Sequence, residues 1–165
     1  MTRTISSPMG PLLLRPERAE DADFRFRLFC QSKPEFDLLP LAGAARERFM
    51  RMQFDAQTSG YRAQFPDAEF AIIESEGECI GRSVIDRNEK ELNYIELLLL
   101  PQLRSRGVGT AIIRAAIEEA QASGITMVFK VEPGNLAALR LYKRLGFIET
   151  GQAALHISMA WPPAS

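Results

Sequence analysis

The pattern of apolar and polar residues along this chain predicts alternating strands and helices. Short apolar runs that end at proline, glycine or charged turns predict strands at residues 12–15, 69–74, 79–86, 92–100, 126–131, 147–150 and 154–161. Apolar residues at helical spacing predict helices at residues 24–30, 44–57 and 107–122, and a further helix between Asn135 and Gly146. Residues 1–10 show neither pattern, so we expect a flexible N-terminal tail followed by one domain over residues 11–165.

The clearest local pattern is a strand, a basic turn and a helix in direct succession. The turn carries Arg104 and Arg106, and the helix begins around Gly107 and Gly109, followed by the hydroxyl of Thr110. Backbone N–H groups at a helix start lack intrahelical partners and carry partial positive charge, so they bind anions. Because glycines allow close approach to the backbone, the turn predicts a bound phosphate or pyrophosphate. An ordinary tight strand-to-helix turn is the alternative.

The glycine spacing in this turn differs from two common phosphate motifs. It lacks the third glycine of a dinucleotide-binding fingerprint and the Gly-Lys-Ser/Thr sequence of a P-loop. The turn contains Arg104-x-x-Gly107-x-Gly109, and a second motif follows as Asn135-x-x-Ala138-x-x-x-Tyr142-x-x-x-Gly146-Phe147. Together and in this order, the two motifs resemble the acetyl-coenzyme A (acetyl-CoA) loop and the other signature of the GNAT superfamily of N-acetyltransferases. The resemblance is specific over residues 94–147.

This resemblance implies an α/β fold with a mixed, mostly antiparallel central sheet of about six or seven strands flanked by helices. It also implies acetyl transfer from acetyl-CoA to a primary amine of a small molecule or a peptide, directly, in a ternary complex. In the family, a bulged central strand is splayed from its neighbour and binds the coenzyme through its backbone. The residues that the resemblance assigns to acetyl-CoA are Leu98, Leu99, Leu100, Arg104, Ser105, Arg106, Gly107, Val108, Gly109, Thr110, Asn135, Ala138 and Tyr142. Ser105 replaces a glycine often found after the loop arginine, and we expect the loop to survive.

Two residues are candidates for moving protons. The resemblance makes Tyr142 the general acid that protonates the departing thiolate, with a core aromatic residue as the alternative. Glu96 is the candidate base, because a carboxylate in an apolar strand is costly unless it faces water, a partner or a substrate. A salt-bridged or solvent-facing glutamate is the alternative. The one histidine, His156, is expected on the surface or at the edge of the cleft rather than as a base.

Composition narrows the class of protein further. The net charge of −1 and the pI of about 5.9 do not favour a nucleic-acid partner. No apolar stretch reaches the roughly 18 residues that a membrane span needs. Cys30 and Cys79 form neither a metal spacing nor a disulfide framework, so we expect reduced thiols, no metal and a cytoplasmic protein. A homodimer is compatible with the sequence. Two rival functions stay open: an acyl-CoA-binding sensor without turnover, and a transferase of a longer acyl group.

Overall fold

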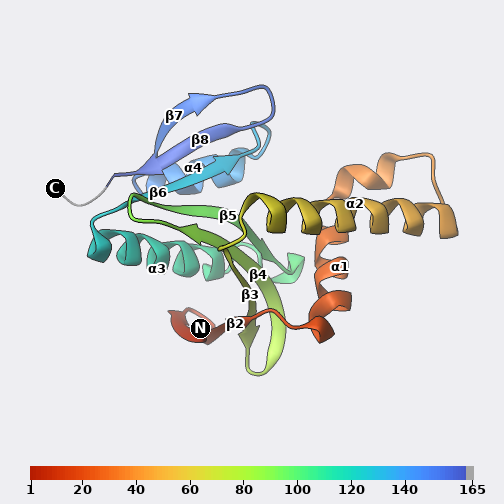
Figure 1. The fold of residues 1–165 in the computed structure, drawn as a ribbon, viewed down its shortest axis with the longest axis horizontal. Helices are drawn as coiled ribbons and strands as arrows, with labels where there is room; N and C mark the ends of the chain where they lie inside the picture. The colour runs from red at the N-terminus through yellow and green to blue at the C-terminus, as the bar shows by residue number, and fades with distance from the viewer. Residues whose placement is uncertain (163–165) are drawn as a thin grey trace.

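An eight-stranded sheet organises the protein in the computed structural model, which describes residues 1–162 (Figure 1). The strands follow the order β1-β2-β3-β4-β5-β6-β8-β7, and neighbouring strands are antiparallel except β5 and β6, which are parallel. The mixed, mostly antiparallel fold is therefore confirmed, with more strands than the six or seven predicted. The strands are β1 (Arg3–Ser7), β2 (Gly10–Pro16), β3 (Glu69–Ser75), β4 (Glu78–Arg87), β5 (Glu91–Leu99), β6 (Thr126–Val131), β7 (Ile148–Gln152) and β8 (Ile157–Trp161).

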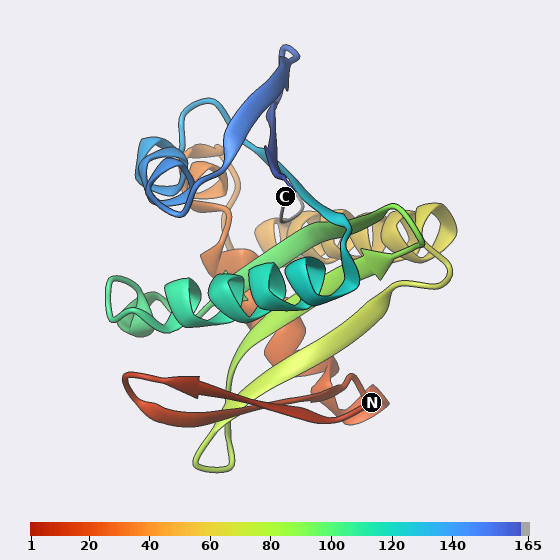
Figure 2. The ribbon, with the colours of Figure 1, turned by 90° about the vertical axis from the view of Figure 1, so that its left-hand side faces the viewer.

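Helices cover both faces of this sheet. The α-helices are α1 (Ala22–Gln31), α2 (Gly43–Gln64), α3 (Val108–Ser123) and α4 (Leu136–Arg144), with 3-10 turns η1 (Ala19–Asp21), η2 (Pro34–Leu38) and η3 (Pro101–Leu103). Figure 2 shows α3 on one face and α1 with α2 behind the other. The larger core lies under α3 and includes the buried side chains of Ile112 and Met127, and a smaller cluster joins Phe24 and Leu28 of α1 to Ile72 of β3.

The start of the chain does not form the loose tail that we expected over residues 1–10. Residues Arg3–Ser7 form β1, which pairs with β2 through a tight turn at Gly10, whose φ is +94°. Ile5 is buried against the larger core, and Arg3 donates a 2.8 Å hydrogen bond to Glu119 of α3. The strand is therefore held by contacts with residues far away in the sequence. At the other end, residues 163–165 of the predicted domain lie outside the described residues.

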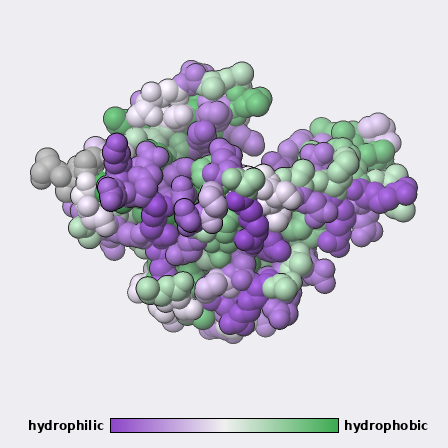
Figure 3. Space-filling view, in the orientation of Figure 1, coloured by the Kyte–Doolittle hydropathy of each residue, from purple (hydrophilic) through white to green (hydrophobic). Residues whose placement is uncertain are grey.

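Helix α2 is longer than the predicted helix at residues 44–57, because it continues through Ser59 and Gly60 to Gln64. A glycine inside a helix costs only about 1 kcal/mol relative to alanine, which packing of the next turn can offset. Here Arg62 stacks over the ring of Phe70, with its guanidinium 4.5 Å from the ring centroid. The outer part of α2 projects from the body together with η2, and apolar patches lie among hydrophilic residues there (Figures 1 and 3).

A buried ion pair connects β2 to the start of α1. Arg15 binds both carboxylate oxygens of Asp21 at 2.8 Å and Glu74 of β3 at 2.6 Å. Asp21 also accepts a hydrogen bond from the backbone N–H of Arg18 at 2.7 Å. It holds the N-cap position of α1, but its side chain makes no capping bond to that helix. The hydrogen bond from Arg15 is the main cause that holds the pKa of Asp21 below its usual value.

We expect Asp21→Asn to destabilise the protein by about 3 kcal/mol at pH 7, because it leaves part of a buried ion pair uncompensated. The folded-state pKa of Asp21 is lowered, so its stabilisation is present above the unfolded value of about 3.9 and is lost as pH falls below it. Urea unfolding of wild type and variant between pH 7 and pH 3 should show the difference shrinking toward acid. Asp23→Asn, at an exposed neighbour, is the control. A difference that is absent, or that does not change with pH, would contradict this account.

Candidate functional site

The central feature of the site is the separation of β5 from β6. The two strands pair only from Glu91 to Tyr94 on β5, whereas β5 stays paired with β4 as far as Leu99. A register shift in the β4–β5 ladder leaves Ile95 without a partner, which is a β-bulge. Bulges bend the strand that carries them. The second half of β5 therefore runs beside an opening instead of a neighbouring strand.

This opening exposes backbone groups of β5 on its free side. Leu100 donates its N–H to the carbonyl of Ile80 at 2.9 Å. Because hydrogen-bonded pairs alternate along an antiparallel ladder, Leu98 also bonds to β4, while the backbone groups of Leu97 and Leu99 point the other way. Of the three leucines predicted to bind ligand through the backbone, Leu99 is thus placed to do so. Leu97, which was not predicted, is placed in the same way. Leu98 and the N–H of Leu100 are instead bonded to β4.

Gly81 of β4 allows the two strands to stay close at this end. A Cβ atom on Gly81 would collide with the backbone carbonyl of Leu98 and would lie 2.8 Å from Cδ2 of Leu99. Any larger residue would have to push β5 away from β4. The position of the free strand edge thus depends on this glycine, although nothing in the glycine's sequence context indicated it.

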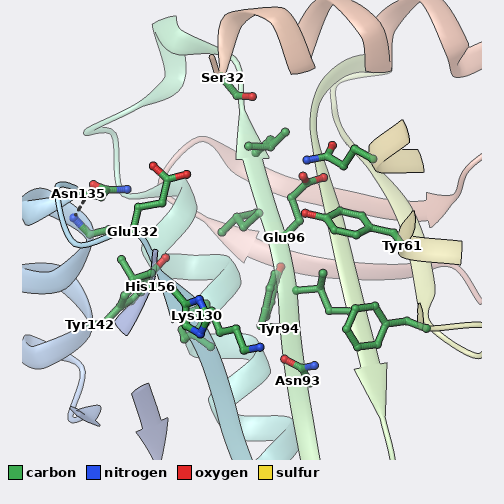
Figure 4. Close-up of a pocket in the computed structure, with 18 of the residues that line it drawn as sticks. Ser32, Tyr61, Asn93, Tyr94, Glu96, Lys130, Glu132, Asn135, Tyr142 and His156 are labelled. Carbon is green, nitrogen blue, oxygen red and sulfur yellow. Dashed lines mark hydrogen bonds between the residues drawn. The ribbon is translucent and has the colours of Figure 1, made fainter. Parts of the chain in front are cut away.

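A pocket of about 470 Å³ opens between β5, β6 and the C-terminal end of α2 (Figure 4). Figure 4 shows Glu96 and Tyr61 on one side of it, and Tyr142 and His156 on the other. His156 thus lines the cleft, in line with the cleft-edge position expected for it. The charged and polar residues that line the pocket are Ser32, Lys33, Gln57, Tyr61, Gln64, Asn93, Tyr94, Glu96, Lys130, Glu132, Asn135, Tyr142 and His156.

Glu96 is buried and ion-paired, and it also lines the pocket. Its Oε2 atom accepts a 2.8 Å hydrogen bond from Nη1 of Arg82, and its side chain is 9% exposed. Burial raises the pKa of Glu96 above its usual range, and the charge of Arg82 opposes the increase. The hydroxyl of Tyr61 points toward this carboxylate, and burial together with the nearby charge raises the pKa of Tyr61 to about 12. Glu96 is therefore salt-bridged and also lines the pocket, and its role as a base stays a prediction.

Tyr142 lies across the pocket on α4. Its ring stacks on Phe129 of β6, with ring centroids 4.3 Å apart, and it makes an edge contact with Phe147. Burial raises the pKa of the Tyr142 phenol, so it stays protonated at neutral pH and can donate a proton. Asn135 is the N-cap of α4 and accepts a 3.2 Å hydrogen bond from the N–H of Ala138. That bond uses the side-chain oxygen of Asn135 and leaves its amide nitrogen for another partner.

The predicted phosphate-binding turn lies between the end of β5 and α3. Gly107 has φ of +78° and is the N-cap of α3, a helix of 16 residues. Ser105 also has a left-handed backbone, with φ of +62°, which costs a residue other than glycine about 1 kcal/mol or more. Arg104 and Arg106 are exposed and make no ion pair within residues 1–162.

The start of α3 has room for an anionic ligand. A Cβ at Gly109 would meet only Cδ1 of Leu99, at the ordinary contact distance of 3.6 Å, so this glycine is not required by packing. The side chain of Val108 is fully buried, which leaves only its backbone for a ligand. Together with the positive arginines and the free edge of β5, this start fits a pyrophosphate joined to an extended arm. Among residues 1–162, no group of three or more His, Cys, Asp or Glu could hold a metal ion, and no helix is long and apolar enough to cross a membrane.

Sequence reasoning missed two residues that surround Glu96, namely Arg82 and Glu17. Arg82 is a charged residue inside the apolar run at residues 79–86, and Glu96 is another inside the next strand. Two opposite charges in adjacent apolar strands are a signal for a buried pair, because each would be costly alone. The contribution of Glu17 depends on how the chain folds back, which no local pattern shows.

Comparison with known proteins assigns this architecture to one family. Residues 39–147 match the model of the acetyltransferase (GNAT) family. An uncharacterized N-acetyltransferase of Methanocaldococcus jannaschii is 38% identical over an alignment of 88 residues that covers 48% of this chain and 39% of that protein. The L-methionine sulfoximine/L-methionine sulfone acetyltransferase of Pseudomonas aeruginosa is 44% identical over 50 residues, or 30% of this chain and 29% of that protein. The matches thus span well under half of these relatives.

Solved structures agree with the fold. The PaiA N-acetyltransferase of Thermoplasma acidophilum in complex with coenzyme A has a TM-score of 0.68 and 16% identity, covering 92% of this chain and 98% of that one. The ribosomal-protein-S18-alanine N-acetyltransferase of Escherichia coli has a TM-score of 0.61 and 18% identity, covering 93% and 95%. At these identities the likeness concerns the fold alone.

Proposed function

Because the chain belongs to the GNAT acetyltransferase family, we propose that it transfers an acetyl group from acetyl-CoA to a primary amine. The acceptor is a small molecule or the end of a peptide, and the transfer is direct, with both substrates bound. The observation that carries this proposal is the free edge of β5, which runs from the start of α3 to a pocket between Glu96 and Tyr142. The pocket volume of about 470 Å³ is in the range of small-molecule sites.

The proposed coenzyme site follows the chain from the turn to the strand edge. Backbone N–H groups at Gly107, Val108 and Gly109 would bind the pyrophosphate, with Arg104 and Arg106 adding positive charge. Ser105 and Thr110 contribute hydroxyls beside them. The backbone groups of Leu97 and Leu99, together with Asn135 and Ala138 of α4, would bind the amide-containing arm. The PaiA protein was solved with coenzyme A and a GNAT protein of Elizabethkingia anophelis with acetyl-CoA, which supports this ligand class.

The two proton-handling residues lie on opposite sides of the pocket. Acetyl-CoA supplies the acetyl group as a thioester, whose C–S bond breaks as the new C–N bond forms. Glu96 accepts the proton that the amine nitrogen loses, directly or through water. Tyr142 donates its phenolic proton to the departing sulfur and is reprotonated from solvent. The raised pKa of Glu96 makes it a better proton acceptor, and the raised pKa of Tyr142 keeps its phenol protonated until the sulfur needs the proton.

We expect the purified protein to release free thiol from acetyl-CoA in the presence of at least one class of primary amine. Gly109→Glu should weaken coenzyme binding at least about a hundredfold, because it adds a negative charge where the pyrophosphate lies. A glutamate near a helix start does not harm the helix, and a Cβ at Gly109 meets only Cδ1 of Leu99 at an ordinary contact distance, so the fold should persist. Calorimetry with CoA measures the affinity.

Gly60→Glu is the matched control, since Gly60 is exposed on α2 with no atom within 4 Å of its Cβ direction. It should bind CoA like wild type. Unchanged affinity in a folded Gly109→Glu protein would reject this coenzyme site. CoA binding without thiol release across amino acids, polyamines, aminoglycosides and peptides would instead favour a sensor that binds acyl-CoA.

We expect Tyr142→Phe to lower kcat by about ten- to a hundredfold while coenzyme affinity stays nearly constant, because only the proton donor is lost. Single-turnover thiol release separates this chemical step from binding. Tyr94→Phe is the control, since the Tyr94 hydroxyl bonds to Ser83 at 2.8 Å inside the core. That variant should lose stability rather than rate. A Tyr142→Phe rate within twofold of wild type would reduce Tyr142 to a packing residue.

A further inference from the structure

Three charged residues form a buried network behind the pocket. Arg82 of β4 donates from Nη1 to Glu96 at 2.8 Å and from Nε to Glu17, which follows β2. The side chains of Arg82 and Glu17 are 4% exposed and that of Glu96 is 9% exposed. The network thus links the pocket to a residue 79 positions earlier in the chain, outside the part that matches the family model.

Such a network is not explained by stability alone. Removing charges from water is costly, and buried ion pairs are often no more stabilising than apolar residues of the same size. The Nη2 atom of Arg82 is buried and has no hydrogen-bond partner in the described part of the chain, which adds to the cost. Arg82 and Glu17 do not line the pocket, so apolar residues in their place would leave the pocket lining unchanged. Glu96 does line the pocket, which suggests that the other two residues act on Glu96.

Charged or titratable groups face Glu96 from the elements packed around it. Arg82 of β4 lies closest, and Glu17, Lys33 just before η2 and Tyr61 of α2 lie within electrostatic reach. Glu17 in turn is 3.5 Å from Arg25 of α1 and 3.4 Å from Arg62 of α2. The groups that line the far side of the pocket are Lys130, Glu132 and His156.

We propose that Arg82 is a positioning residue that holds the Glu96 carboxylate at the pocket and supplies its counter-charge, while Glu17 competes for the same guanidinium and limits its effect. This proposal rests on the proposed function, because it gives Glu96 its importance as the group that receives the proton of the amine. Arg82 itself lies behind Glu96 and does not line the pocket. Its fork geometry, with Nε and Nη1 on different carboxylates, fixes the orientation of Glu96 in a way that a single ammonium could not.

The network predicts opposite effects for its two outer members. Burial raises the pKa of Glu96, Arg82 lowers it, and the negative charge of Glu17 raises it. Arg82→Gln removes the counter-charge, so the pKa of Glu96 should increase by about one or more. Glu17→Gln removes a like charge and leaves Arg82 to Glu96 alone, so the pKa should decrease. If Arg82 and Glu17 had purely structural roles, replacing them would not shift the pKa of Glu96 in opposite directions.

The direct test is a carbon-13 NMR titration of the free protein with labelled glutamate side chains. The Glu96 signal is assigned by its loss in Glu96→Gln. We expect its titration midpoint to move up in Arg82→Gln and down in Glu17→Gln, and to stay near the wild-type value in Arg82→Lys, which keeps the charge. If Arg82→Gln does not fold, the titration midpoints of Glu96 in Arg82→Lys and Glu17→Gln still test the proposal. Shifts in the same direction for Glu17→Gln and Arg82→Gln, or no shift in Glu17→Gln, would overturn the proposal.

A kinetic measurement adds a second readout. With an amine that the enzyme accepts, the acidic limb of kcat/KM should follow the NMR midpoint in each variant, with KM for acetyl-CoA unchanged. An acidic limb that stays fixed while the midpoint moves would overturn the link between the network and proton transfer. NMR shifts of the predicted signs in a protein that releases no thiol with any amine would support the network and reject the transferase.

Discussion

The separation of β5 from β6 after Tyr94 is the feature on which the rest of the site depends. A strand in the middle of a sheet normally satisfies its backbone groups on both sides, and buried backbone groups without partners are costly. Here the bulge at Ile95 and the loss of pairing with β6 leave the free side of Leu97 and Leu99 without a strand neighbour. The sheet remains intact because β4 continues to pair with β5, at a distance that only a glycine at position 81 permits. The fold therefore contains an opening that an extended ligand with amide groups can satisfy.

The same opening separates two ionisable groups that lie in different environments. Glu96 is on the side of the sheet that faces α1 and α2, where Arg82 balances its burial. Tyr142 is on the other side of the gap, stacked on Phe129, where burial acts without a nearby countercharge. Glu17, which precedes the residues matched by the family model, reaches Glu96 through Arg82, so the first part of the chain contributes to the network behind the pocket.

Much of this architecture could be predicted from the sequence, and the exceptions share a cause. The strand at residues 126–131 was predicted with the bounds that β6 has, because turns with clear local signals flank it. Residues 3–7 were missed because β1 is held by Ile5 in the core and by an ion pair with Glu119, both of them long-range contacts. The two motifs identified the turn and α4, but they could not show the network behind Glu96. The residues of this network lie in separate parts of the chain, with Glu17 after β2, Arg82 on β4 and Glu96 on β5.

The central claim is that the free edge of β5 binds the coenzyme through its backbone, and amide hydrogen exchange measured by NMR tests it most directly. The amides of Leu97 and Leu99 should exchange quickly in the free protein and at least one should become protected when CoA binds. Those of Leu98 and Leu100, which bond to β4, should be protected in both states. Protection of Leu97 and Leu99 in the free protein, or exchange at both that CoA does not change, would contradict the account.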